Sequence, residues 1–111
     1  MSSVTATVIN NTSMTLTATA GSASHGNTPS ILSPTLAPHS TTTNVFVAHS
    51  DGAGVEGNVN VASGSVSFSL NYDNPVVGSN SGSVTAPSGY NGSCQAGGGT
   101  DATFVYVLNA N

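Results

Sequence analysis

Apolar and polar residues alternate along much of the chain with a period of two, the pattern of a β-strand with one buried face. In the run over residues 3–10, valines and an alanine alternate mainly with threonines. In the run over residues 13–20, a methionine, a leucine and two alanines oppose a serine and three threonines. We expect these two runs, joined by a turn at Asn10-Asn11, to form a hairpin.

Strand patterns resume in five later segments. We expect strands at Asn44–His49, Val55–Ala62, Ser65–Tyr72, Gly82–Ala86 and Thr103–Asn109, with a tight turn at Ser63-Gly64. The last of these is apolar on both faces, which is typical of a strand in the middle of a sheet and covered on both sides.

Two segments interrupt the strand pattern. Residues 21–41 contain three prolines and two glycines, and proline cannot donate to a strand ladder, so we expect an irregular loop there. The glycine-rich run Gly89–Gly99 predicts a mobile loop.

The pattern favours an all-β fold, because no window combines a helical period with good helix formers. A length of 111 residues fits one domain, so residues 1–111 are expected to form a single unit. About seven to eight short, mainly antiparallel strands separated by turns predict a β-sandwich, with a closed barrel as the alternative.

The chain contains no lysine or arginine, and its four acidic residues give a formal net charge of −4. Nucleic-acid binding is therefore excluded, because lysine and arginine displace the counterions of phosphate. Polybasic attraction to anionic lipid and a Walker-type phosphate loop are excluded for the same reason. A surface of short Ser, Thr, Asn and Gly residues loses little rotamer entropy when it is immobilised, which favours contacts between copies of the chain.

The start of the chain, Met1-Ser2-Ser3-Val4, lacks the positive and apolar regions of a signal peptide, and no apolar run is long enough to span a membrane. These features predict a cytoplasmic protein or one found in an intracellular inclusion, with a mature form whose signal has been removed as the alternative.

Two parts of the chain resemble a known group of proteins. The segment Val8–Leu16, followed by His25-Gly26, resembles the opening hairpin of aegerolysin-like and actinoporin-like β-sandwich proteins, which some bacterial parasporal crystal proteins share. The segments Gly54–Val59, Val66–Leu70 and Asp73–Asn80 resemble the G-x-E-G strand and the later D-N-P-x-x-G-S-N segment of that group. The resemblance implies a β-sandwich of this length whose relatives bind membrane lipids, form pores with partners, or pack into intracellular crystals.

The chain departs from the lipid-binding members of that group. It contains no tryptophan and no basic residue, and its three tyrosines are spread along the sequence. Tyr72 stands where a tryptophan is expected, and Val76 stands where an aromatic residue is expected. These departures weigh against headgroup binding and leave the crystal-forming branch.

Five residues are candidates for ligand binding. Tyr72, Asp73 and Asn74 could line a polar pocket for a lipid headgroup or a sugar, with Tyr90 as a further contact, although Asp73-Asn74-Pro75 also has the composition of a turn. The resemblance implies that Glu56 faces an ammonium headgroup, and a solvent-facing strand position is the alternative.

Catalysis, metals and cofactors are not predicted. The spacings between the three histidines match no metal signature, and the acids lack the spacing of a calcium loop. No G-x-S-x-G nucleophile motif is present.

Cys94 is the single cysteine, so no disulfide can form within the chain. It lies in the glycine-rich run, where we expect an exposed loop. An intermolecular disulfide through Cys94 is one hypothesis, and an inert thiol is the other.

Together these observations predict a non-catalytic structural protein that binds itself and assembles into an ordered homo-oligomer, fibre or crystal. Strand edges without protective lysines would contribute to the contacts. The alternative is a lipid- or carbohydrate-binding module of the aegerolysin-like kind, with pore formation among its modes and membrane lipid as the partner.

Overall fold

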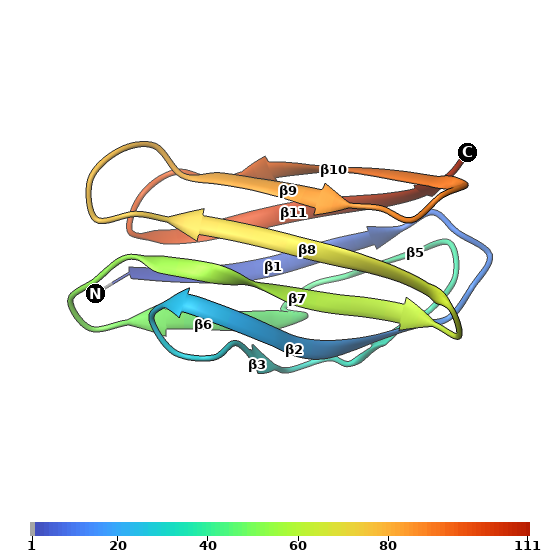
Figure 1. The fold of residues 1–111 in the computed structure, drawn as a ribbon, viewed down its shortest axis with the longest axis horizontal. Coiled ribbons are helices and arrows are strands. Elements are labelled where there is room, and N and C mark those ends of the chain that lie inside the picture. The colour runs from blue at the N-terminus through green and yellow to red at the C-terminus, as the bar shows by residue number, and fades with distance from the viewer. Residues whose placement is uncertain (1) are drawn as a thin grey trace.

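The computed structural model describes residues 2–111, which form eleven β-strands (Figure 1). The strands are β1 (Ser2–Asn10), β2 (Leu16–His25), β3 (Ser30–Ile31), β4 (Thr35–Leu36), β5 (Ser40–Thr42), β6 (Phe46–Ser50), β7 (Val55–Ser63), β8 (Val66–Asn74), β9 (Ser81–Thr85), β10 (Tyr90–Ala96) and β11 (Asp101–Ala110). No helix occurs in these residues, so none of them lies in a helix that could cross a membrane.

The strands form two sheets (Figure 1). The two sheets share one hydrophobic core. The first sheet has the order β10-β11-β1-β6-β3, and β5 pairs with β1 alongside β6. The second sheet has the order β4-β2-β7-β8-β9. All pairs are antiparallel except β1 with β11. The prediction of an all-β sandwich is therefore confirmed.

The predicted hairpin between residues 3–10 and 13–20 is wrong, because β1 and β2 lie in different sheets. β1 pairs with β11, β6 and β5, whereas β2 pairs with β7 and β4. Each of the two strands has one apolar face. With the strands in opposite sheets, both faces point into the core between the sheets. The apolar pattern alone is the same for a hairpin and for a crossover between sheets.

Asn10 stabilises this crossover from inside the protein, where it is only 1% exposed. Its Nδ2 donates to the backbone carbonyls of Met14 (2.9 Å), Leu36 (3.3 Å) and Ala37 (3.0 Å). Its Oδ1 accepts from the backbone N–H of Thr12 (3.0 Å) and the Thr12 hydroxyl (2.7 Å). One side chain thus satisfies the backbone where the chain leaves the first sheet.

The segment expected to be an irregular loop, residues 21–41, contains more strand than predicted. β2 continues to His25, with irregular register against β7 after Ala20, and three short strands follow. The prolines lie just outside those strands: Pro29 precedes β3, and Pro34 precedes β4. Strands of two or three residues fit between prolines because no ladder N–H is required from the proline itself.

The glycine-rich run is not a mobile loop, because Tyr90–Ala96 forms β10 and pairs with β11 along its length. A β-carbon at Gly92 would lie 2.6 Å from Cγ1 of Val84, and one at Gly82 would lie 2.6 Å from Sγ of Cys94. We call this contact between the two edge strands, formed by Gly82, Val84, Gly92 and Cys94, the β9–β10 seam. Its glycines allow the two sheets to approach closely.

The core confirms the alternating pattern of the expected strands. Phe68, Leu70 and Tyr72 on β8 are buried, as are Phe104 and Tyr106 on β11. The middle position predicted for the last strand is confirmed, because β11 lies between β10 and β1. The prediction that its second face is covered is wrong: within residues 2–111 no third layer lies there, so the valines on that face are only partly buried.

The β7–β8 turn consists of Gly64-Ser65, one residue later than predicted. Gly64 has a φ of 57°, which glycine adopts without steric cost, and it takes the first central position of a two-residue hairpin loop.

All four acidic residues lie at one end of the sandwich, where β1 begins and β8 ends (Figure 1). Asp51 follows the end of β6, Glu56 is near the start of β7, Asp73 is near the end of β8, and Asp101 begins β11. The register agrees, because Glu56 pairs with Asp73 and Ser3 pairs with Asp101. We call this region the acidic end.

Candidate functional site

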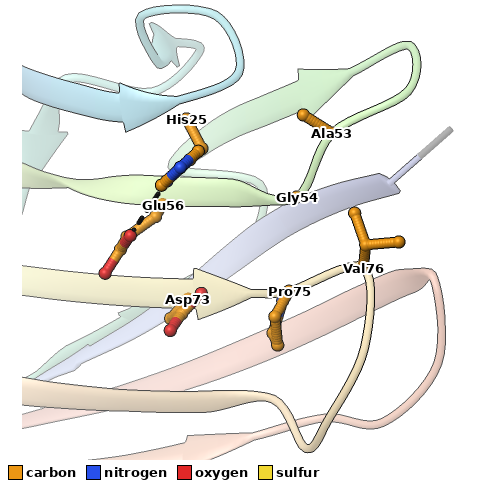
Figure 2. Close-up of a pocket in the computed structure, with 7 residues that line it drawn as sticks. All are labelled: His25, Ala53, Gly54, Glu56, Asp73, Pro75 and Val76. Carbon is orange, nitrogen blue, oxygen red and sulfur yellow. Dashed lines mark hydrogen bonds and ion pairs between the residues drawn. The ribbon is translucent and has the colours of Figure 1, made fainter.

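A small pocket opens at the acidic end (Figure 2). Its volume is about 310 Å³, and it is lined by His25, Ala53, Gly54, Glu56, Asp73, Pro75 and Val76. These residues come from the ends of β2, β7 and β8 and from the loops that follow β6 and β8.

Two carboxylates and one imidazole supply the charge of the pocket. Glu56 and Asp73 are direct cross-strand partners, and Nδ1 of His25 lies 3.1 Å from Oε1 of Glu56. Burial raises the pKa of Asp73, the neighbouring Glu56 raises it further, and His25 lowers it. Because the chain has no lysine or arginine, only histidine can offset these acids within the pocket. The pocket therefore suits an uncharged or cationic group.

The loop between β8 and β9 carries exposed apolar side chains beside this pocket. Val76 is 68% exposed and Val77 is 87% exposed. The loop is fixed at its far side, because Nδ2 of Asn80 donates to the carbonyls of Gly97 (2.8 Å) and Gly99 (3.0 Å). The protein thus holds two valines in water next to a pair of carboxylates.

A wider groove of about 650 Å³ lies on the outer face of the second sheet. It shares Glu56 and Asp73 with the pocket and continues over Asn58, Asn71 and Ser83. We call it the polar groove, because its lining consists mainly of amide, hydroxyl and carboxylate groups.

The structure separates the five residues predicted to bind a ligand. Glu56 and Asp73 lie side by side at the pocket. Tyr72 points into the core, is 2% exposed, and has a hydroxyl without a hydrogen-bond partner among the described residues. Asn74 is also 2% exposed, and Tyr90 packs edge-on against Phe68.

Asn74 connects the two sheets. Its Nδ2 donates to the carbonyls of Ser3 (3.0 Å), Gly99 (3.3 Å) and Thr100 (3.0 Å). Asp73 and Asn74 are the last residues of β8, so the turn expected at Asp73-Asn74-Pro75 begins only after them. The ligand-binding role of Tyr72, Asn74 and Tyr90 stays a prediction, and their burial assigns them first to packing.

Sequence reasoning missed His25, Val76 and Val77 as parts of this site. His25 reaches Glu56 through strand pairing, which no local pattern records. The two valines do carry a sequence signal, since adjacent apolar residues between a proline and a glycine are unusual for a loop.

Cys94 lies in the β9–β10 seam, not in an exposed loop, and it is partly buried. Burial raises the pKa of its thiol to about 11, although a hydrogen bond with Tyr106 acts in the opposite direction. An intermolecular disulfide stays a prediction, and it would require the seam to open.

The three histidines lie apart from one another. His25 ends β2, His49 lies in β6 beside Asn27, and His39 occupies a turn with a φ of 51°. Within residues 2–111, no group of three or more His, Cys, Asp or Glu side chains is arranged to hold a metal ion.

We expect the free energy of unfolding to fall steadily as the pH rises above about 9. Burial raises the pKa of Cys94 to about 11 and that of Tyr72 to about 12, and it also raises the pKa of Tyr106. The unfolded chain releases these protons first, so alkaline pH favours it. Urea unfolding followed by circular dichroism across this range measures the effect. In a Cys94→Ser variant the loss of stability should begin at a higher pH, because only the tyrosines remain to titrate. A urea midpoint of the wild type that does not change with pH would contradict the expectation.

The fold defines a two-sheet β-sandwich with a polar, acidic site at one end. The crystal structure of lipid binding protein Nakanori, at 1.5 Å resolution, has this fold. The TM-score is 0.75, the match covers 97% of this chain and 71% of that one, and the sequences are 16% identical. No protein-family model and no curated protein sequence matches the chain. The similarity therefore shows the fold.

Proposed function

We propose that this protein is a lipid-binding module that attaches to a membrane surface through its acidic end. The observation that carries the proposal is the pair of exposed valines, Val76 and Val77, fixed beside the pocket of Glu56 and Asp73. A loop that holds apolar side chains in water beside polar groups fits the boundary between acyl chains and headgroups.

The energy available from this loop is sufficient for reversible binding. Moving a valine from water into the acyl boundary contributes about 1–2 kcal/mol, so the pair contributes about 3 kcal/mol, equivalent to about a hundredfold in affinity. Headgroup contacts in the pocket would add to this.

The charge of the acidic end selects the kind of membrane. Four carboxylates at one end, with no lysine or arginine anywhere in the chain, are repelled by a negatively charged leaflet. The proposal therefore specifies membranes whose lipids are uncharged or zwitterionic. Nakanori, which has the same fold, is a lipid binding protein, and this supports a lipid partner for this chain.

Flotation with phosphatidylcholine vesicles tests the proposal. We expect the wild-type protein to float with the vesicles, and the double variant Val76→Ser/Val77→Ser to bind about tenfold to a hundredfold more weakly. Leu32→Ser is the matched control, because Leu32 is also exposed (54%) but lies between β3 and β4. Adding phosphatidylserine to the vesicles should weaken binding. Equal binding by the double variant and the wild type would contradict the proposal.

A further inference from the structure

The polar groove begins at the acidic end and runs along the outer face of the second sheet. Its outward side chains form two rows across three neighbouring strands, which the register fixes. The rows are Glu56–Asp73–Ser81 and Asn58–Asn71–Ser83.

A chain of hydrogen bonds holds the groove in one arrangement. Nδ2 of Asn58 donates to the hydroxyl of Ser69 (2.9 Å), and that hydroxyl donates to Oδ1 of Asn71 (2.9 Å). Nδ2 of Asn71 then donates to the hydroxyls of Ser83 (3.1 Å) and Thr85 (3.0 Å). The chain ends at the hydroxyls of Ser83 and Thr85, which accept these bonds, so the hydroxyl hydrogen of Ser83, which lines the groove, is left to donate to a bound molecule.

The opposite hydrogen-bonding capacity is found at the acidic end of the groove. The ionised carboxylates of Asp73 and Glu56 can only accept hydrogen bonds. Glu56 accepts at Oε1 from the hydroxyl of Ser24. The groove therefore offers acceptors in one row and hydroxyl donors in the next, spaced about 7 Å apart along a strand.

We infer that this groove binds the neutral sugar headgroup of a glycolipid, an inference that rests on the proposed membrane attachment. A sugar ring carries hydroxyls that donate to Asp73 and Glu56 and accept from Ser83. The volume of about 650 Å³ lies within the range of ligand pockets.

Charge excludes the main competing headgroups. A phosphate placed here would face Glu56 and Asp73 without any lysine or arginine to bind it, so phospholipid headgroups are disfavoured. A quaternary ammonium group is recognised through aromatic faces, and the one aromatic side chain along the groove, Tyr72, is buried in the core.

The membrane as the source of the sugar follows from the position of the groove. It shares Glu56 and Asp73 with the pocket beside Val76, so a headgroup in the groove lies next to the loop that contacts the bilayer. A free saccharide would use the same polar groups but would gain nothing from the valines.

The test compares vesicles of phosphatidylcholine alone with vesicles that also contain galactosylceramide or phosphatidylethanolamine. We expect galactosylceramide to increase binding by about tenfold and phosphatidylethanolamine to leave it unchanged. Ser83→Tyr, which fills the groove, should reduce binding to the level of phosphatidylcholine alone. Ser67→Tyr is the matched control, because Ser67 is exposed on the same face of β8 outside the groove. Asp73→Asn should lower the increase without changing the shape of the groove.

The outcomes separate this inference from the proposed function. Equal binding to all three vesicles, or a preference for phosphatidylethanolamine, would overturn the sugar assignment and leave membrane attachment standing. Absence of binding to every vesicle would overturn both. Binding of free galactose by a protein that ignores vesicles would overturn the glycolipid source, and an equal loss in Ser67→Tyr would remove the groove as the location.

Discussion

Replacing Asn10 with alanine is expected to lower the free energy of unfolding by about 3–4 kcal/mol. The amide of Asn10 donates to three backbone carbonyls, and its oxygen accepts two hydrogen bonds from Thr12. Alanine would leave these groups without partners in a place where water does not reach, since Asn10 is 1% exposed. Chemical denaturation of the purified variant measures the loss.

The neighbouring Asn11 provides the control for this prediction. Asn11 is exposed, and its Nδ2 donates to the side chain of Asn109. Asn11→Ala should therefore change the free energy of unfolding by about 0.5 kcal/mol or less. A free energy of unfolding that falls no more in Asn10→Ala than in Asn11→Ala would show that the chain crosses between the sheets without help from Asn10.

Replacing Gly92 with valine is expected to cost about 3 kcal/mol, by overpacking the β9–β10 seam. Even a single β-carbon at Gly92 would lie 2.6 Å from Val84 and 2.8 Å from the carbonyl of Val107, so the two sheets would have to separate. The thiol of Cys94 lies in the same seam, and we expect it to react faster with a thiol reagent in this variant.

Gly98→Val is the control for the seam, because a β-carbon at Gly98 meets no atom within 4 Å and the residue has no positive φ. We expect its free energy of unfolding to stay close to that of the wild type. An unchanged stability in Gly92→Val would mean that the glycine-rich run is as mobile as its composition suggested.

The strand pattern predicted the fold class well because burial acts on every second residue of each strand. Runs such as Val66–Tyr72 show this signal directly. The pairing of strands is harder to predict from the sequence, because β1 and β2 show the same alternation whether they form a hairpin or lie in different sheets. The decisive contact there is a side chain of Asn10 that reaches Leu36, which is distant in sequence.

Glycine composition was the weakest guide. The composition of Gly89–Gly99 predicts a mobile loop, yet at Gly92 a neighbouring strand lies too close for a β-carbon. A close approach between layers and a flexible loop produce the same composition, so only the fold distinguishes them.

Two of the five residues predicted to bind a ligand line the pocket. Glu56 and Asp73 were both selected from the sequence, but their meeting across β7 and β8 comes from register. Tyr72 and Asn74 flank Asp73 on the strand and therefore point to the opposite face, into the core. Self-assembly, which the composition favoured, stays a prediction, and light scattering of the purified protein would test it.

The position of the four acids makes the charge distribution of the molecule asymmetric along its long axis. It is 39 Å long and 21 Å across, and its side-chain charge lies at one end of the long axis. At physiological salt the screening length is about 8 Å, so the carboxylates of two copies repel one another appreciably only when their acidic ends are in contact. Neighbours in any lattice should therefore lie head to tail, or side by side with their acidic ends pointing in opposite directions. Contacts that bring two acidic ends together should form only where acid has neutralised the carboxylates.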